Sequence, residues 1–155
     1  MRVYIASPFF SPEQLDYVKA IEATLDEFKI DYFSPRNEGV IKEMSDSDKL
    51  KNAKRMYLKN VAELIACNIT LVNLDWKDTG TIFELGYAAR LKEEIYNPDK
   101  TRKIVTFTTI EKPVNLMLKY CIDIHAENYK YLGSILEEIS EGELTTTKNN
   151  LRIDE

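Results

Sequence analysis

Residues 69–88 read ITLVNLDWKDTGTIFELGYA, and this stretch decides the fold. Its first six residues are mostly apolar or β-branched, which is typical of a buried strand. Further on, Ile82, Leu85 and Ala88 recur at helical spacing and predict a helix from about residue 81 to residue 93. A strand that passes directly into a helix is the repeating unit of an α/β fold, and ligands bind at that edge of such sheets. We therefore expect the polar residues of the junction to lie at a binding site.

The junction holds three acidic residues, Asp75, Asp78 and Glu84. One interpretation is purely local: Thr79 or Thr81 is the N-cap, and Glu84 completes a capping box of the S/T-x-x-E type. The other interpretation is chemical, because a carboxylate on a rigid element can be aimed at a substrate. The local pattern is compatible with both.

Outward from this stretch, the chain alternates strands and helices. Strands are predicted at residues 3–6, 31–34, 69–74, 103–108 and 122–124, and helices at 12–28, 45–67, 81–93, 113–120 and 129–139. Such alternation implies an α/β fold, a flavodoxin-like, five-stranded, mostly parallel sheet with helices on both faces. We expect the strand order 2-1-3-4-5, which places the end of the first strand beside residues 75–80 at the switch point.

The domain organisation is expected to be simple. Residues 1–141 form one domain, and residues 142–155 form a polar C-terminal tail. The helix at 45–67 is polar, with a predicted buried stripe of Leu50, Ala53, Met56, Tyr57, Val61, Leu64 and Ile65.

Composition excludes several classes of function. The 155 residues are 44% hydrophobic and carry a net charge of −5, so no attraction for nucleic acid is expected. Cys67 and Cys121 lie in apolar stretches and are predicted to be buried free thiols of a cytoplasmic protein. No signal peptide or membrane span is expected. With His125 as the single histidine and no phosphate-binding glycine loop, no metal or organic cofactor is expected.

Carboxylates therefore remain the best reactive candidates. Ser7 has no plausible histidine partner, since His125 lies at the far end of the chain and is expected to be structural. Paired carboxylates suit chemistry at a glycosidic bond, where one attacks and another handles the proton. Tyr4, Phe9 and Phe10 could sandwich a flat base, although core and rim packing would explain them equally well.

Three motifs, in this order, resemble the nucleoside 2-deoxyribosyltransferase family. They are VYIASPFF at residues 3–10, DTGTIFELGYA at residues 78–88 and KPVNLM at residues 112–117. The resemblance covers nearly the whole chain. It implies that the base of a 2′-deoxyribonucleoside is exchanged through a covalent 2-deoxyribosyl-enzyme intermediate, without a metal or cofactor.

The resemblance also implies roles for individual residues. Glu84 would be the nucleophile, Tyr4 would orient it, and Asp78 would exchange a proton with the base. The expected substrate-binding residues are Phe9, Phe10, Asn60, Asp75, Gly80 and Asn115. Asn115 would come from a neighbouring subunit, which implies a homo-oligomer built from dimers, up to a hexamer. The predicted exposure of three aromatic residues late in the chain also supports a homo-oligomer. They are Tyr120, Tyr129 and Tyr131.

One departure from the family pattern concerns proton transfer. Asn60 stands where family members carry a second aspartate, and an amide cannot act as an acid at neutral pH, although it can still hydrogen-bond a base.

Two alternative functions remain open at this stage. The first is a deoxynucleoside 5′-monophosphate N-glycosidase, but residues 7–11 lack the arginine and glycine expected of a phosphate-binding loop. The second is a non-catalytic nucleoside- or nucleotide-sensing module on the same fold. The loss of an acid at Asn60 favours this module slightly, whereas the combination of Tyr4, Asp78 and Glu84 argues against it.

Overall fold

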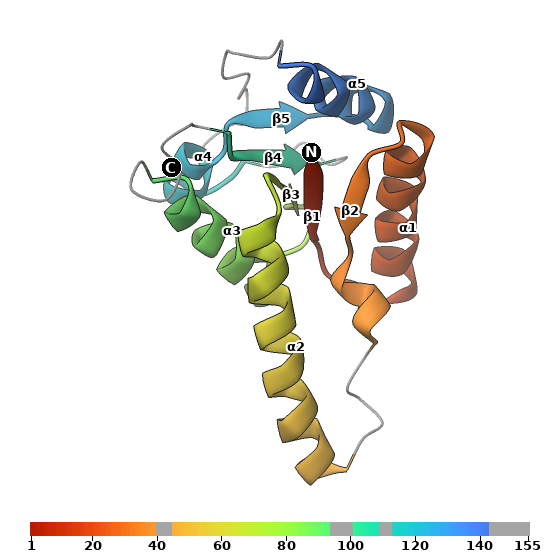
Figure 1. Ribbon diagram of the computed structural model, residues 1–155, viewed down its shortest axis with the longest axis vertical. Coiled ribbons are helices and arrows are strands. Elements are labelled where there is room, and N and C mark those ends of the chain that lie inside the picture. The colour runs from red at the N-terminus through yellow and green to blue at the C-terminus, as the bar shows by residue number, and fades with distance from the viewer. Residues whose placement is uncertain (40–44, 94–100, 109–112, 143–155) are drawn as a thin grey trace.

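The computed structural model describes residues 1–39, 45–93, 101–108 and 113–142. Strands and helices alternate along the chain (Figure 1). The strands are β1 (Arg2–Ala6), β2 (Asp31–Phe33), β3 (Ile69–Asn73), β4 (Lys103–Phe107) and β5 (Ile124–Ala126). The helices are α1 (Pro12–Glu27), the 3-10 turn η1 (Pro35–Glu38), α2 (Asp46–Ala66), α3 (Thr79–Leu91), α4 (Leu116–Cys121) and α5 (Tyr129–Ser140).

The five strands form one sheet in the order β2-β1-β3-β4-β5. The predicted order is therefore confirmed, and all four strand pairs are parallel. In the pairing of β1 with β3, Ala6 lies opposite Val72. The residues that follow these two strands thus begin side by side, which is the arrangement of a switch point.

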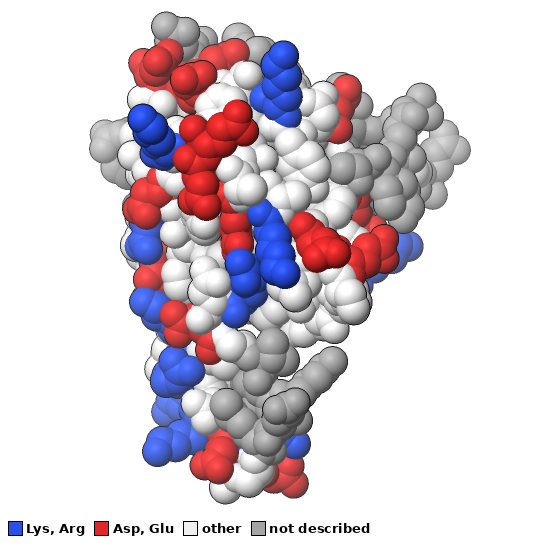
Figure 2. Space-filling model, turned by 90° about the vertical axis from the view of Figure 1, so that its right-hand side faces the viewer, with Lys and Arg blue, Asp and Glu red and all other residues white. Residues whose placement is uncertain are grey.

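The sheet buries both of its faces. Alternate residues of a strand point to opposite faces, so Val3 and Ile5 pack with α1 and α5, whereas Tyr4 and Ala6 pack with α2 and α3. The helices lie on the two sides of the sheet in Figure 1. The face covered by α1, which is turned to the viewer in Figure 2, carries acidic and basic side chains interspersed.

Local signals explain where several elements begin and end. Ser11 caps α1 and forms a capping box with Gln14, and Pro12 is the first helical residue. The fifth strand begins two residues later than predicted, because Ile122 is the C-cap of α4 and Asp123 accepts a hydrogen bond from the backbone N–H of Ile104.

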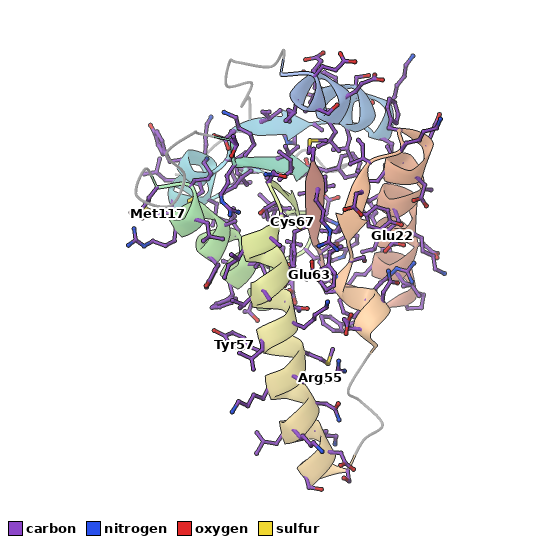
Figure 3. The ribbon with its side chains drawn as sticks, in the orientation of Figure 1. Glu22, Arg55, Tyr57, Glu63, Cys67 and Met117 are labelled. Atoms are coloured by element: carbon purple, nitrogen blue, oxygen red, sulfur yellow. The ribbon has the colours of Figure 1, made fainter. Side chains whose placement is uncertain are left out.

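The predicted buried stripe of α2 is confirmed only at Leu64. Leu64 is the one buried residue of this helix, whereas Leu50 is 77% exposed and Tyr57 is 53% exposed. The reason is length: at 1.5 Å per residue a helix of 21 residues extends about 30 Å, far beyond strands of three to five residues. The N-terminal half of α2 therefore projects away from the sheet (Figure 1), and the half-exposed ring of Tyr57 (Figure 3) has its centroid 6.3 Å from that of Phe83 on α3.

Other predictions have mixed outcomes. Cys67 is buried and Cys121 is half-buried, and both are free thiols. His125 is buried, with its Nδ1 atom 3.2 Å from the hydroxyl of Thr106, in keeping with a structural residue. Tyr120 and Tyr131 are exposed, but Tyr129 is not, because it packs against Phe107.

Some predictions are not tested. The tail at 143–155 and residue 112 of the third motif lie outside the described residues. The division into a domain and a tail stays a prediction. Among the helices that the structure describes, none is both long and apolar enough to cross a membrane.

Candidate active site

A cavity of about 350 Å³ opens at the carboxyl end of β1. Its volume falls within the range of small-molecule sites in proteins. Its walls come from the loop after β1, from η1 and the residue after it, from α2 and from the start of α3. The lining residues are Ser7, Phe9, Phe10, Pro35, Gly39, Met56, Asn60, Asp78, Gly80, Thr81 and Glu84.

Tyr4 and Glu84 meet beside this cavity. The hydroxyl of Tyr4 donates a hydrogen bond to Glu84 Oε1 over 2.6 Å. Tyr4 is fully buried in β1, and burial raises the pKa of its phenol, so this hydroxyl stays protonated and acts as a donor. Burial also raises the pKa of Glu84 to about 7, the Tyr4 hydrogen bond opposes that rise, and the charge of Asp78 adds to it. Glu84 thus changes charge near neutral pH.

Asp78 is the N-cap of α3. Its Oδ2 atom accepts hydrogen bonds from the backbone N–H of Thr81 at 2.7 Å and from the Thr81 hydroxyl at 2.9 Å. The local interpretation, with Thr79 or Thr81 as N-cap and Glu84 as capping-box partner, is therefore wrong. Glu84 lies in the second turn of α3, where its carboxylate faces Tyr4 and leaves the capping to Asp78.

Gly80 leaves room for the Asp78 carboxylate. A Cβ atom at residue 80 would lie 3.1 Å from Asp78 Oδ2, closer than most such contacts. Because Gly80 has no Cβ atom, the Asp78 carboxylate can cap the helix and line the cavity at the same time.

Asn60 brings an unused acceptor to the cavity. Its Oδ1 atom is buried and, among the described residues, has no hydrogen-bond partner. A buried carbonyl oxygen without a partner costs about 1–3 kcal/mol, so a ligand N–H or O–H at this position would be bound favourably. Met56 lies one turn earlier on the same face of α2 and adds an apolar contact.

Phe9 and Phe10 form an aromatic wall of the cavity. Their ring centroids are 4.8 Å apart, and the ring of Phe10 is more than half exposed. Gln14 holds the loop in place, because its side-chain oxygen accepts hydrogen bonds from the backbone N–H groups of Phe10 and Ser11. The wall is therefore open to a flat ligand on one side.

Two predicted substrate-binding residues lie elsewhere. Asp75 is absent from the lining of the cavity, and its buried carboxylate accepts a hydrogen bond from the hydroxyl of Tyr17. Asn115 caps α4, with its side-chain oxygen bound to the N–H of Met117 over 2.9 Å, and it is absent from the lining too. The roles predicted for both residues are not tested.

Sequence reasoning missed several lining residues. Pro35 and Gly39 follow β2, and the rule that parallel strands end at one edge would have pointed to them. Met56 precedes Asn60 by four residues, so helical spacing would have placed both on one face. None of these three residues carries a chemical signal of its own.

The charges of the lining residues restrict the chemical class of ligand that the cavity can bind. Asp78 and Glu84 are acidic, and the other described residues of the lining include neither lysine nor arginine. Among these described residues, a phosphate group would find no basic partner. In the part of the chain that the structure describes, no group of three His, Cys, Asp or Glu residues could hold a metal ion.

Comparisons with known proteins agree with this geometry. A model of the family described as nucleoside 2-deoxyribosyltransferase matches residues 3–117. A solved 2-deoxyribosyltransferase from Bacillus psychrosaccharolyticus is 19% identical, with a TM-score of 0.75 over 97% of this chain and 100% of that chain. At this identity the likeness concerns the fold.

Two further structures are similar. A 2-desoxiribosyltransferase from Leishmania mexicana is 25% identical, with a TM-score of 0.50 over 79% of this chain and 72% of that chain. A conserved protein from Enterococcus faecalis V583 is 20% identical, with a TM-score of 0.52 over 92% of this chain and 98% of that chain. A comparison with curated protein sequences found no significant match.

Proposed function

The chain belongs to the nucleoside 2-deoxyribosyltransferase family and is an enzyme of that class, and we propose that it exchanges the base of a 2′-deoxyribonucleoside through a covalent intermediate on Glu84. The observation that carries the proposal is the hydrogen bond from the buried Tyr4 hydroxyl to Glu84 Oε1 at the cavity. A carboxylate held by one neutral donor is oriented and still free to use its other oxygen as a nucleophile.

The reaction divides into two displacements. In the first, a carboxylate oxygen of Glu84 bonds to C1′ of the sugar, the glycosidic C–N bond breaks, and its electron pair stays on the departing base. In the second, a nitrogen of the incoming base bonds to C1′, and the C–O bond to Glu84 breaks. Both pass through an oxocarbenium-like transition state, which a negative carboxylate stabilises.

Asp78 handles the proton of the base. When protonated, it gives its proton to the departing base, and its carboxylate later accepts the proton that the incoming base loses. Its place at the positive end of α3 keeps the carboxylate fixed after the transfer. Asn60 contributes binding, because its unpartnered Oδ1 atom accepts a hydrogen bond from an N–H group of the base.

The substrate is a nucleoside with a free 5′-hydroxyl group. The two acidic side chains of the cavity would repel a 5′-phosphate, and the described residues of the lining offer no basic side chain to bind it. These features disfavour the deoxynucleoside 5′-monophosphate N-glycosidase. The free thiols of Cys67 and Cys121 suit a reducing compartment such as the cytoplasm.

The working enzyme is a homo-oligomer. Exposed apolar side chains of α2 and of the α4 region support association with a second copy of the chain, among them Leu50, Tyr57, Leu58, Leu116, Met117 and Tyr120. Met117 and Tyr57 both point outward in Figure 3. Asn115 does not line the cavity of its own subunit. In the assembly we propose, the partner's Asn115 completes the site. Light scattering should give the mass of at least a dimer, and a monomeric mass would refute this assembly.

Chromatography of reaction mixtures tests the proposed activity. The protein is incubated with thymidine plus adenine, with thymidine alone, and with thymidine 5′-monophosphate. We expect deoxyadenosine in the first mixture, with little free thymine in the second and none in the third. Release of free base from the monophosphate without any base exchange would replace the proposal with the N-glycosidase. If no mixture gives a product but the protein binds nucleoside, the sensing module would be favoured.

A further inference from the structure

Asn73 joins two loops that lead to different parts of the active site. It is the last residue of β3 and is completely buried. Its side-chain nitrogen donates a hydrogen bond to the hydroxyl of Ser7 over 3.1 Å, and its side-chain oxygen accepts one from the N–H of Asp75 over 2.9 Å. One buried amide thus contacts both the loop after β1 and the loop after β3.

This amide stands where the backbone ladder stops. The pairing of β1 with β3 ends at Ala6 opposite Val72, one residue before Ser7 and Asn73. Beyond that point the two loops lead to different walls of the cavity. The first carries Phe9 and Phe10, and the second leads to Asp78.

The chemistry of the position favours an amide. A single side chain must donate to a hydroxyl and accept from a backbone N–H, and a neutral amide offers both functions. An apolar residue of similar size would leave the Asp75 N–H without this acceptor in a buried setting, which is costly. Asn73 is therefore matched to its two partners.

We propose that Asn73 is a positioning residue that sets the distance between the Phe9–Phe10 wall and Asp78, across the slot that holds the base. The proposal rests on the proposed function, which gives that slot its ligand. Asp78 keeps its place through its capping bonds to Thr81, and the Tyr4–Glu84 pair joins β1 to α3. The part that shifts when Asn73 is lost is therefore the loop that carries Phe9 and Phe10. Loss of Asn73 therefore weakens the binding of nucleoside and free base more than it slows the chemical steps.

The test compares Asn73→Leu with a matched control, Thr106→Val. Thr106 is also completely buried, in the neighbouring strand β4, and its hydroxyl contacts the Ile124 carbonyl and the His125 ring. It is absent from the lining of the cavity. Both variants remove a completely buried polar group from a strand of the same sheet, so both should lower the melting temperature.

A second readout does not depend on activity. Trp76 is the single tryptophan of the chain and lies in the loop after β3. Its ring is edge-on to that of Tyr17, with the two ring centroids 5.0 Å apart. Its fluorescence anisotropy and its quenching by acrylamide therefore report on the order of that loop.

In Asn73→Leu we expect KM for nucleoside and for acceptor base to rise about tenfold, with a smaller change in kcat. Quenching of Trp76 should increase as well. In Thr106→Val, KM and quenching should stay at wild-type values. Equal KM and quenching in the two variants would overturn the proposal.

Ser7→Ala provides an independent test if Asn73→Leu does not fold. It removes the same link from the other loop, and Trp76 should become more quenched although it is on a different loop from residue 7. Unchanged quenching in Ser7→Ala would overturn the proposal. A wild-type protein without transfer activity would refute the proposed function alone, because Trp76 quenching still decides whether Asn73 holds the loops.

Discussion

Two glutamates, one on each side of the sheet, show what separates a structural carboxylate from a reactive one. Glu22 on α1 is buried, and Arg36 donates to both of its oxygens, with a Nε to Oε1 distance of 2.8 Å. Figure 3 shows Glu22 between α1 and β2. Glu84 on α3 has the neutral hydroxyl of Tyr4 instead of a cation, and it lines a cavity.

The difference in partners has an energetic meaning. A guanidinium that binds both oxygens neutralises a carboxylate and fixes it, which makes Glu22 a stable tie between α1 and η1. For Glu84, burial without a cation destabilises the negative charge and raises its pKa to about 7. Because the negative charge of such a carboxylate is destabilised, the carboxylate loses an unfavourable charge when it bonds to an electron-poor carbon, and this makes it a better nucleophile.

The largest expected effect comes from Glu84→Gln. The amide keeps the shape but lacks the nucleophilic charge, so base exchange should fall by at least about 10³-fold. The melting temperature should stay the same or rise, since a costly buried carboxylate is removed. The measurement is the steady-state exchange rate together with thermal unfolding. Near wild-type exchange in this variant would exclude Glu84 from the mechanism.

Glu22→Gln is the matched variant on the other side of the sheet. It leaves Arg36 without its charged partner, and we expect the free energy of unfolding to fall by about 3 kcal/mol. Urea denaturation measures this loss. The exchange rate of the folded protein should be preserved, and a loss of activity as large as that of Glu84→Gln would erase the distinction between the two glutamates.

Asp78→Asn separates proton transfer from helix capping. Asparagine is as good an N-cap as aspartate, so the fold should be retained. The rate with ordinary deoxynucleosides should fall by about 10²-fold, because the departing base loses its proton donor. Nucleosides with an activated leaving base should be affected less. If both kinds of substrate slow equally, Asp78 does not carry the proton.

The smallest expected effect concerns pH. Since Glu84 must be ionised to attack, kcat/KM should rise as the pH increases through about 7, the pKa of Glu84. Tyr4→Phe removes the hydrogen bond that lowers this pKa, so the midpoint should move to higher pH. At pH values below the midpoint, kcat/KM of Tyr4→Phe should be about tenfold lower than that of the wild-type protein. A pH profile that is identical in the two proteins would show that Tyr4 does not tune Glu84.

Much of the fold could be predicted because local signals and global arrangement agree. The apolar runs of β1 and β3 and the capping box at Ser11 each point to one element, and parallel alternation then determines the sheet order. Apart from Leu64, the predicted stripe of α2 is not buried, and the reason is physical: amphipathic spacing reports which residues share a face, but not whether the sheet is long enough to cover that face.

The site was less accessible to sequence reasoning. Asp78 and Glu84 stood out because acids at a strand-to-helix junction are conspicuous, whereas the contact of Tyr4 with Glu84 joins residues far apart in the chain and came from the family resemblance. Asn73 was invisible, because its importance depends on a partner 66 residues away. Hydrogen bonds between distant loops leave no periodic pattern to detect.

The covalent intermediate is the central claim, and mass spectrometry of the intact protein tests it most directly. The enzyme is mixed with excess 2′-deoxynucleoside, quenched in acid within one turnover and digested for peptide mapping. The account predicts a mass increase of one deoxyribosyl group, located on the peptide that contains Glu84 and absent from Glu84→Gln. Rapid turnover without any adduct, or an adduct on another carboxylate, would contradict it.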